Sequence, residues 1–442
     1  MILDNTKINF PIKTLKTLFK INFNEIQEDD NWNQDNQDES LMHKIHIYPA
    51  KFPALIANQS FEYARKKKQK LTTIGDIFCG CGTVALESQK RDYNFIGYDI
   101  NPVAAMISRA KGNYYDIKKV EEYQNKILTF YSKTIVSSDN YYKANERLKY
   151  WFFEEQYLEL LKIKVSIDKV IKSGKYLDLF YCIFSNSLKK CSRWLSKSIK
   201  PQIDPNKKCA IPIEEYKINF KKILKSINQL VENHKFNPDV VTDIKCQNIL
   251  NNTEHFGEID MIITSPPYVT SYEYADLHQL SSLWLGYSKD YTELRKGSIG
   301  SLYNTNFYSI NYKSLNVTAK KTIEELEKTK IASAKIKSIA RYYEEMNIIV
   351  NKCNELLKPD GRVVFVIGDT DYKKIKMENS KFLCEALLKN GFEIEMISRR
   401  KISNKYLTPY RDENGKFSNK KDGREIYSKE FIIIGRKKTN GN

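Results

Sequence analysis

The 442-residue sequence lacks the marks of several large protein classes. Its eight cysteines include no C-x-x-C pair, so we expect neither a disulfide framework nor a zinc ribbon, and a reducing cytoplasm fits best. Glycine (17) and proline (12) are too scarce for collagen-like or elastic repeats. The longest apolar runs, such as 363–367, are far shorter than the roughly 20 residues that span a bilayer. The N-terminus lacks the basic and then apolar order of a signal peptide.

Positive charge is abundant instead. The sequence has 72 Lys and Arg against 54 Asp and Glu, a formal net charge of +18. Residues 24–42 hold seven of the acids and no Lys or Arg, which leaves +25 on the other residues. Such an excess favours a polyanionic partner: nucleic acid is the usual one, and an anionic membrane surface is the alternative. Hydrophobic residues (41 %) and aromatic residues (12 %) exclude a wholly disordered chain.

The pattern along the chain divides it into four parts. Residues 1–42 are predicted to be an N-terminal arm and a solvated acidic linker, and 112–237 a Lys-rich inserted helical subdomain. Residues 43–111 and 238–437 alternate between strands and helices, and their first βαβ unit favours a mostly parallel sheet. We expect about seven strands, at 73–78, 94–100, 240–246, 259–264, 362–367, 392–398 and 430–436. We expect helices at 83–90, 102–111, 334–357 and 380–389, and a solvated helical face at 319–345.

A glycine-rich turn follows the first predicted strand. Gly80 and Gly82 allow a sharp turn and a close approach of a ligand, in a G-x-G-x-x-A pattern that leaves a nicotinamide dinucleotide open. Asp99 ends the next strand, where an acid accepts hydrogen bonds from the ribose hydroxyls of an adenosine. The two elements together predict an adenosine-containing ligand. Cys79 and Cys81 have no further ligands at metal spacing, so we expect them to be small, packed turn residues.

A second turn, Thr264-Ser265-Pro266-Pro267-Tyr268, follows the predicted strand at 259–264. The prolines fix the backbone and remove two donors, which leaves the Ser265 hydroxyl and the Pro266 carbonyl as acceptors. These oxygens stand at the carboxyl end of a strand, where open α/β sheets bind ligands. A rigid pair of acceptors beside the flat ring of Tyr268 suits a planar amine. The alternative interpretation is a proline-rich loop with a packed tyrosine.

Both turns resemble motifs of the DNA methyltransferases that modify amino groups. The family has an F-x-G-x-G cofactor loop and a [DNS]-P-P-[YFW] catalytic loop, matched here by residues 78–82 and 265–268. Residues 46–53 (HIYPAKFP) look like the family's N-terminal cofactor-pocket motif. The resemblance implies a Rossmann-like class I methyltransferase fold with S-adenosyl-L-methionine as methyl donor, S-adenosyl-L-homocysteine as product, and no metal. The Ser form of the catalytic loop is similar to that of enzymes that methylate cytosine N4.

The resemblance implies a set of site residues. The catalytic residues are Ser265, Pro266, Pro267 and Tyr268. The cofactor-binding residues are Tyr48, Pro49, Lys51, Phe52, Asp76, Phe78, Cys79, Gly80, Gly82, Thr83, Asp99, Ile100, Asn101 and Thr264. The implied reaction is direct transfer to a base flipped out of the duplex. Adenine N6, an RNA or protein amide, and a non-catalytic cofactor-sensing DNA-binding protein remain alternatives.

Double-stranded DNA is the expected partner, and a cognate restriction endonuclease or other defence proteins could accompany the chain. The location that the resemblance implies is the prokaryotic cytoplasm, in association with the nucleoid. Three basic regions, 186–200, 287–330 and 399–421, are the candidate DNA-contacting segments. Within them we expect DNA contacts from Lys189, Lys190, Arg193, Lys197, Arg295, Lys296, Arg399, Arg400, Lys405 and Arg411. Leu283 and Trp284 are instead expected to be packing residues on a helix.

Overall fold

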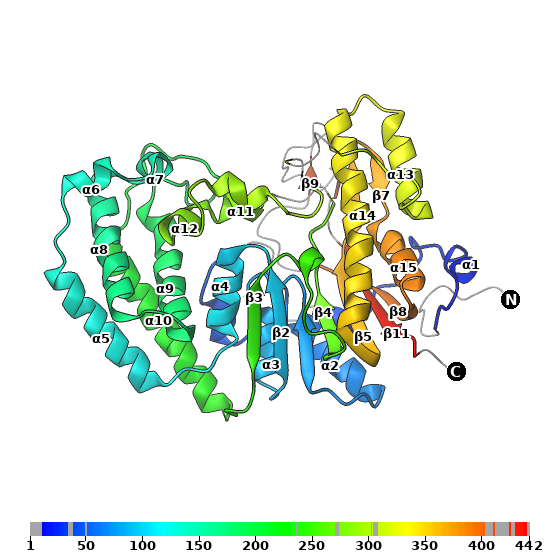
Figure 1. The fold of residues 1–442 in the computed structure, drawn as a ribbon, viewed down its shortest axis with the longest axis horizontal. Coiled ribbons are helices and arrows are strands. Elements are labelled where there is room, and N and C mark those ends of the chain that lie inside the picture. The colour runs from blue at the N-terminus through cyan, green and yellow to red at the C-terminus, as the bar shows by residue number, and fades with distance from the viewer. Residues whose placement is uncertain are drawn as a thin grey trace.

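The computed structural model describes residues 11–33, 39–48, 51–235, 237–269, 274–301, 303, 308–402, 410–411, 424–425 and 429–439. It consists of a central sheet covered by helices, with a group of further helices beyond one sheet edge (Figure 1). No helix among these residues combines the length and the apolar character needed to cross a membrane.

The sheet has seven strands within the described residues, in the order β3-β2-β1-β4-β5-β11-β8. Strand β11 runs antiparallel to both of its neighbours, and the other pairings are parallel. This confirms the predicted mostly parallel α/β fold. The strands are β1 (Thr73–Asp76), β2 (Asn94–Asp99), β3 (Thr242–Cys246), β4 (Ile259–Thr264), β5 (Leu357–Ile367), β8 (Phe392–Lys401) and β11 (Lys429–Lys437). Strand β5 begins at Leu357 rather than at the predicted residue 362, because residues 358–361 form an irregularity within its pairing with β4.

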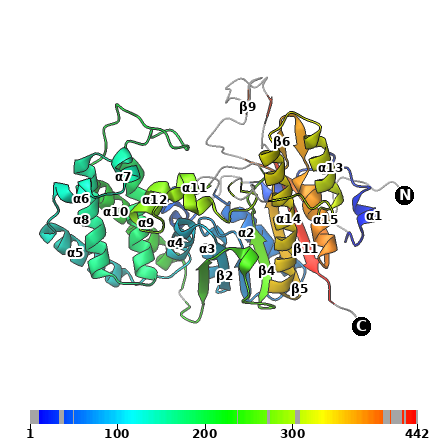
Figure 2. The same ribbon diagram turned by 45° about the horizontal axis from the view of Figure 1, so that its top comes forward.

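Helices cover both faces of the sheet (Figures 1 and 2). The inward residues of α2 (Ala54–Lys66), α3 (Thr83–Gln89) and α4 (Pro102–Lys111) share one apolar core with one face of the sheet. The inward residues of α13 (Val317–Glu327), α14 (Ser333–Leu356) and α15 (Asn379–Lys389) share a second core with the other face. A sheet buried on both faces explains why its strands read as apolar runs.

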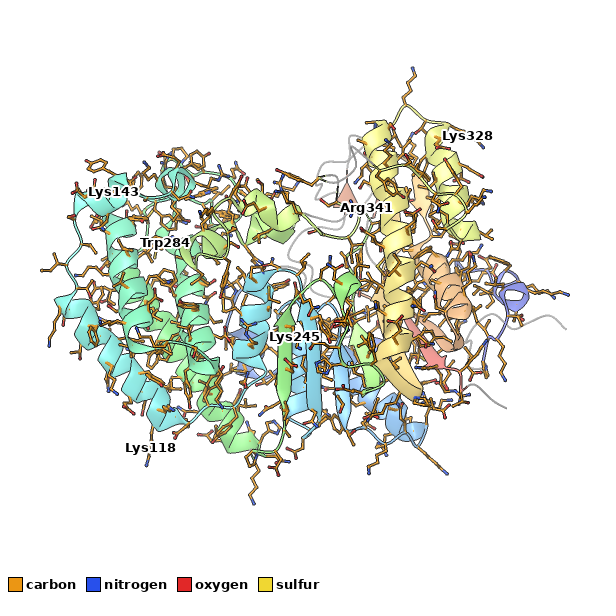
Figure 3. All side chains as sticks on the ribbon, in the orientation of Figure 1. Lys118, Lys143, Lys245, Trp284, Lys328 and Arg341 are labelled. Carbon is orange, nitrogen blue, oxygen red and sulfur yellow. The ribbon has the colours of Figure 1, made fainter. Side chains whose placement is uncertain are left out.

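The segment 112–237 is helical, and its helices lie beyond β3 (Figure 1). Helix α9 packs on α4, and the buried residues of the segment form a third core together with residues of α4 and α12 (Gln279–Trp284). Leu283 and Trp284 are 9 % and 7 % exposed in this core, as predicted, and Figure 3 shows Trp284 among the helices. The helices are α5 (Ile117–Lys133), α6 (Ser138–Tyr142), α7 (Glu146–Trp151), α8 (Glu154–Val170), α9 (Lys175–Cys191) and α10 (Pro212–Asn233).

The acidic segment is not a solvated linker in its described part. Ile26 and Trp32 are 2 % and 4 % exposed, and the Asp29 N–H donates to the Arg399 carbonyl. Glu28 forms ion pairs with Lys401 and Lys429. The prediction was wrong because a count of charged residues does not show two contacts. The apolar side chains of Ile26 and Trp32 are buried in the cores beside the sheet, and Glu28 is paired with lysines distant in sequence.

The predicted helix at 319–345 is in fact two helices, α13 and α14, separated at 328–332. The acids Glu324 and Glu327 are exposed as expected, but Ala319, Ile323 and Leu326 are fully buried. The break lets α13 fold back against α14, so both apolar stripes reach the same core.

Candidate active site

The two predicted turns meet at the carboxyl edge of the sheet. Strand β1 lies between β2 and β4, so the glycine-rich loop after β1 is flanked by Asp99 at the end of β2 and Ser265 after β4. Parallel strands that end at one edge form the ligand-binding crevice of open α/β folds.

The glycine-rich loop adopts a conformation that its glycines permit. Gly80 and Gly82 have φ of +50° and +73°, in the left-handed region that disfavours other residues. A Cβ at Gly82 would come within 2.7 Å of the Ser108 Cα, so glycine is also required there for close packing against α4. Cys79 and Cys81 are 5 % and 3 % exposed, which confirms that they are packed turn residues.

Asp99 is held in place by backbone donors. The Gly80 N–H donates to Oδ2 and the Asn101 N–H to Oδ1, each at 2.8 Å. Burial raises the pKa of Asp99 to about 6. A carboxylate oxygen accepts more than one hydrogen bond, so both oxygens keep capacity for the hydroxyls of a ribose. These two acceptor oxygens fit the ribose of an adenosine-containing cofactor.

Asp76 ties the two loops together. Its Oδ1 accepts from the Phe78 N–H at 3.0 Å and from the Thr264 hydroxyl at 2.7 Å. Burial, with a smaller contribution from the charge of Asp99, raises the pKa of Asp76 to about 7. Asp76 and Thr264 therefore link the end of β1 to the end of β4 beneath the crevice.

His278, a buried residue that no sequence motif indicated, lies beside Asn101 and Tyr48 at this side of the crevice. The Asn101 amide lies 2.9 Å from His278 Nδ1, and the His278 ring lies 5.2 Å from the Tyr48 ring. Burial lowers the pKa of His278 to about 3, so the ring is neutral at pH 7. Tyr48 in turn reaches the glycine-rich loop, because a Cβ at Gly80 would lie 3.4 Å from the Tyr48 hydroxyl. His278 has no motif around it that could have revealed this role.

The remaining predicted cofactor residues surround this group. Asn101 also caps α4 by accepting from the Val103 N–H. Thr83, the first residue of α3, is buried, Phe78 packs on the core, and Ile100 lies against Gly297. Lys51 pairs with Glu39, Phe52 packs beside α2, and Pro49 lies outside the described residues.

The catalytic-loop candidates are anchored to neighbouring strands. The Ser265 hydroxyl donates to the Val366 carbonyl of β5 at 3.1 Å, so its lone pairs remain available as acceptors. Pro266 is buried and Pro267 partly exposed. The Tyr268 hydroxyl donates to Glu430 Oε1 at 2.6 Å. The arrangement presents acceptors and an aromatic ring next to the glycine-rich loop, which suits a planar amine.

The predicted DNA-contacting cations are spread over three parts of the chain. Lys189 donates to the Ser198 carbonyl, Lys190 pairs with Glu215, Arg193 lies over the Phe153 ring, and Lys197 is exposed. Arg295 pairs with Asp276, while Lys296 is exposed. Arg399 donates to the carbonyls of Asn24 and Ile26, and so holds the N-terminal segment. Arg411 lies on the short strand β9 (Tyr410–Arg411), and Lys405 is outside the described residues.

The prediction that Arg400 contacts DNA is wrong. Its side chain is 2 % exposed and faces Glu430, so it is not available to a DNA phosphate. The composition of the basic run gave no sign of this, because β8 extends to Lys401 and buries Arg400 between the partly exposed Arg399 and the exposed Lys401.

A mostly parallel sheet with one antiparallel strand and a glycine-rich loop at its carboxyl edge defines a Rossmann-like class I methyltransferase fold. A family model described as DNA methylase matches residues 259–441. The chain is 23 % identical over 403 residues to Type II methyltransferase M.MvaI of Kocuria varians, covering 86 % of this chain and 88 % of that protein. It is 22 % identical to Type II methyltransferase M.BsoBI of Geobacillus stearothermophilus, covering 77 % and 76 %. These matches confirm the resemblance to the amino DNA methyltransferases.

Among solved structures, a SAM-dependent methyltransferase from Methanosarcina mazei aligns with a TM-score of 0.31 at 10 % identity, covering 89 % of this chain and all of that one. Within the described residues, no group of three or more His, Cys, Asp or Glu side chains is placed to hold a metal ion.

Proposed function

We propose that the protein is a site-specific DNA methyltransferase that transfers a methyl group from S-adenosyl-L-methionine to the N4 amine of cytosine. One observation carries the proposal: the Asp76–Thr264 hydrogen bond joins the strand end before the glycine-rich loop to the start of the Ser-Pro-Pro-Tyr loop. A cofactor site and an amine site are thereby held at one sheet edge. The match to a DNA methylase family model supports DNA as the substrate.

The cofactor supplies an electrophilic methyl group on a sulfonium. Asp99 binds the ribose hydroxyls, and Gly80 leaves room for the ligand beside Tyr48. Ser265 and the Pro266 carbonyl would accept hydrogen bonds from the two N–H groups of the target amine, which directs the nitrogen lone pair toward the methyl group. The N–CH3 bond forms as the S–CH3 bond breaks, S-adenosyl-L-homocysteine leaves, and the methylated amine loses one proton to water. Tyr268 stacks on the base. Positioning and electrostatics supply the catalysis, with no covalent enzyme intermediate.

Cytosine N4 is proposed because the loop begins with Ser265 rather than an acid. Adenine N6 is the alternative within the class, since the same pair of acceptors fits either exocyclic amine. A cognate endonuclease and a prokaryotic cytoplasmic location are parts of the same proposal.

Methylation-aware sequencing of DNA from cells that express the protein tests the proposal. We expect N4-methylcytosine at one short recurrent sequence, and none in cells that express Ser265→Ala at the same level. Detection of N6-methyladenine in place of N4-methylcytosine would change the proposed target from cytosine to adenine. Unmodified DNA, with soluble wild-type protein present, would contradict the DNA substrate.

A further inference from the structure

The hydroxyl of Tyr268 is held by a side chain 162 residues away. Tyr268 Oη lies 2.6 Å from Glu430 Oε1. Glu430 is near the start of β11 and stands directly opposite Arg400 of β8 in the antiparallel register. Directly opposed residues project to the same face of a sheet, and here Arg400 Nε lies 3.4 Å from Glu430 Oε2.

This chain of contacts is largely shielded from water. The side chains of Arg400 and Glu430 are 2 % and 16 % exposed. A carboxylate with so little solvent is costly unless an opposite charge and hydrogen-bond donors compensate it. Arg400 supplies the charge, and Tyr268 supplies a donor.

The ring of Tyr268 has a second constraint. A Cβ at Gly368, just beyond the end of β5, would lie 3.1 Å from the Tyr268 Cε2. The ring edge therefore rests against backbone that carries no side chain. With the hydroxyl fixed at one end and an edge fixed along its length, the plane of the ring is defined.

We infer that Glu430 and Arg400 are positioning residues that set the plane of Tyr268 for stacking on the target base; this inference rests on the proposed function. Stacking between a base and an aromatic side chain contributes only in the correct relative orientation. Tyr268 contacts the base, whereas Glu430 and Arg400 act through it. Their place on β8 and β11 makes the last two strands at one edge of the sheet part of the active site.

The chain contains a matched control on β5 and β8, toward the sheet edge opposite the crevice. Tyr63 of α2 donates to Glu395 Oε2 at 3.2 Å, and Arg362 donates to the same oxygen at 2.8 Å. Arg362 and Glu395 are 8 % and 9 % exposed. This Tyr–Glu–Arg group has the same chemistry and comparable burial but lies toward the amino-terminal end of β5, away from the crevice.

The test compares Glu430→Ala with Glu395→Ala in methyl transfer from labelled cofactor to unmethylated genomic DNA. We expect Glu430→Ala to lower kcat about tenfold, the effect of part of one stacking contact, with KM for the cofactor within about twofold of the wild type. Glu395→Ala should keep kcat although it destabilises the fold. In a Tyr268→Phe background, Glu430→Ala should have little further effect, because the hydroxyl it binds is gone. Equal losses of kcat in the two alanine variants would overturn the inference.

A readout independent of activity is the fluorine NMR signal of 3-fluorotyrosine placed at position 268. We expect Glu430→Ala to shift and broaden this signal, Glu430→Gln to shift it less, and Glu395→Ala to leave it unchanged. A signal that Glu430→Ala does not alter would refute the positioning role. Absence of methyl transfer by the wild type would count against the proposed function instead, and the fluorine signal would still decide whether Glu430 orders the ring.

Discussion

At the scale of single residues, the proposed function makes Asp99 the side chain on which cofactor binding should depend most. Its two oxygens are oriented by the N–H groups of Gly80 and Asn101, so the carboxylate is preorganised before a ligand arrives. Burial of this carboxyl outweighs the two hydrogen bonds and raises its pKa to about 6.

Cofactor affinity should therefore depend on pH. Above about pH 6 Asp99 is charged and accepts from both ribose hydroxyls. Below that pH it is protonated, so S-adenosyl-L-homocysteine should bind progressively more weakly as the pH falls through 6. Calorimetric titration at pH 5.5, 7 and 8 measures this. Asp99→Asn should bind weakly, with a much flatter pH dependence, and Asp99→Ala with wild-type affinity would refute the role of Asp99. If Asp76 were the responsible group, Asp99→Asn would retain the pH dependence.

Ser265 and Tyr268 should affect turnover rather than cofactor binding. Ser265→Ala removes an acceptor for the amine, and Tyr268→Ala removes the stacking ring, so we expect kcat to fall by about 10²-fold or more in each. The affinity for S-adenosyl-L-homocysteine should stay within about twofold. Single-turnover methyl transfer and calorimetry separate the two quantities, and unchanged transfer in either variant would contradict the mechanism.

At the scale of secondary-structure elements, α12 connects the helical insert to the crevice. The buried Gln279 accepts from Trp151 Nε1 and Arg147 Nε of α7, each at 2.9 Å. Its neighbour His278 contacts Asn101 on the opposite side. The insert is therefore joined to the segment that follows the catalytic loop.

Gln279→Leu should destabilise the protein by about 2–4 kcal/mol, because it leaves two donors without their acceptor, both on residues of α7. Gln124→Leu, which removes an acceptor of the buried Tyr216 hydroxyl within the insert, should cost about 1–2 kcal/mol. Urea unfolding of the two variants provides the comparison. A Gln279→Leu variant no less stable than Gln124→Leu would show that the contact contributes little.

The elements that could be predicted from the sequence are those with a local signal. The strand ends at Asp99 and Thr264, the glycine-rich loop and the packed Trp284 follow from apolar runs, turn residues and motif spacing. His278 beside Asn101 and Glu430 beside Tyr268 could not be predicted, because these pairs are separated by 177 and 162 residues and neither His278 nor Glu430 lies in a motif. Arg400 was misassigned because a basic run does not show which of its side chains faces the core.

At the scale of the whole molecule, the net charge of +18 serves binding only where cations are free to contact a phosphate. Several predicted contacts are already paired within the protein, as in Lys190–Glu215 and Arg295–Asp276. Lys197 and Lys296 are exposed.

Removing these two charges should reduce the salt dependence of DNA binding. Each phosphate contact contributes a slope of about 0.9 in a plot of log affinity against log salt. Lys197→Gln with Lys296→Gln should flatten that slope by about 1–2, measured by fluorescence anisotropy. Lys118→Gln is the matched control, because Lys118 is exposed at the far end of the insert (Figure 3). If Lys118→Gln flattened the slope as much as the double change at Lys197 and Lys296, the two lysines would contribute only nonspecific attraction to DNA.

Nucleoside mass spectrometry measures the proposed transfer of a methyl group to a cytosine amine in DNA without any intermediate assay. Purified protein is incubated with unmethylated DNA and isotopically labelled S-adenosyl-L-methionine, and the DNA is digested to nucleosides. We predict labelled N4-methyl-2′-deoxycytidine from the wild type and none from Ser265→Ala. Label in N6-methyladenine alone, or no label in DNA from an enzyme that binds S-adenosyl-L-homocysteine, would contradict the claim.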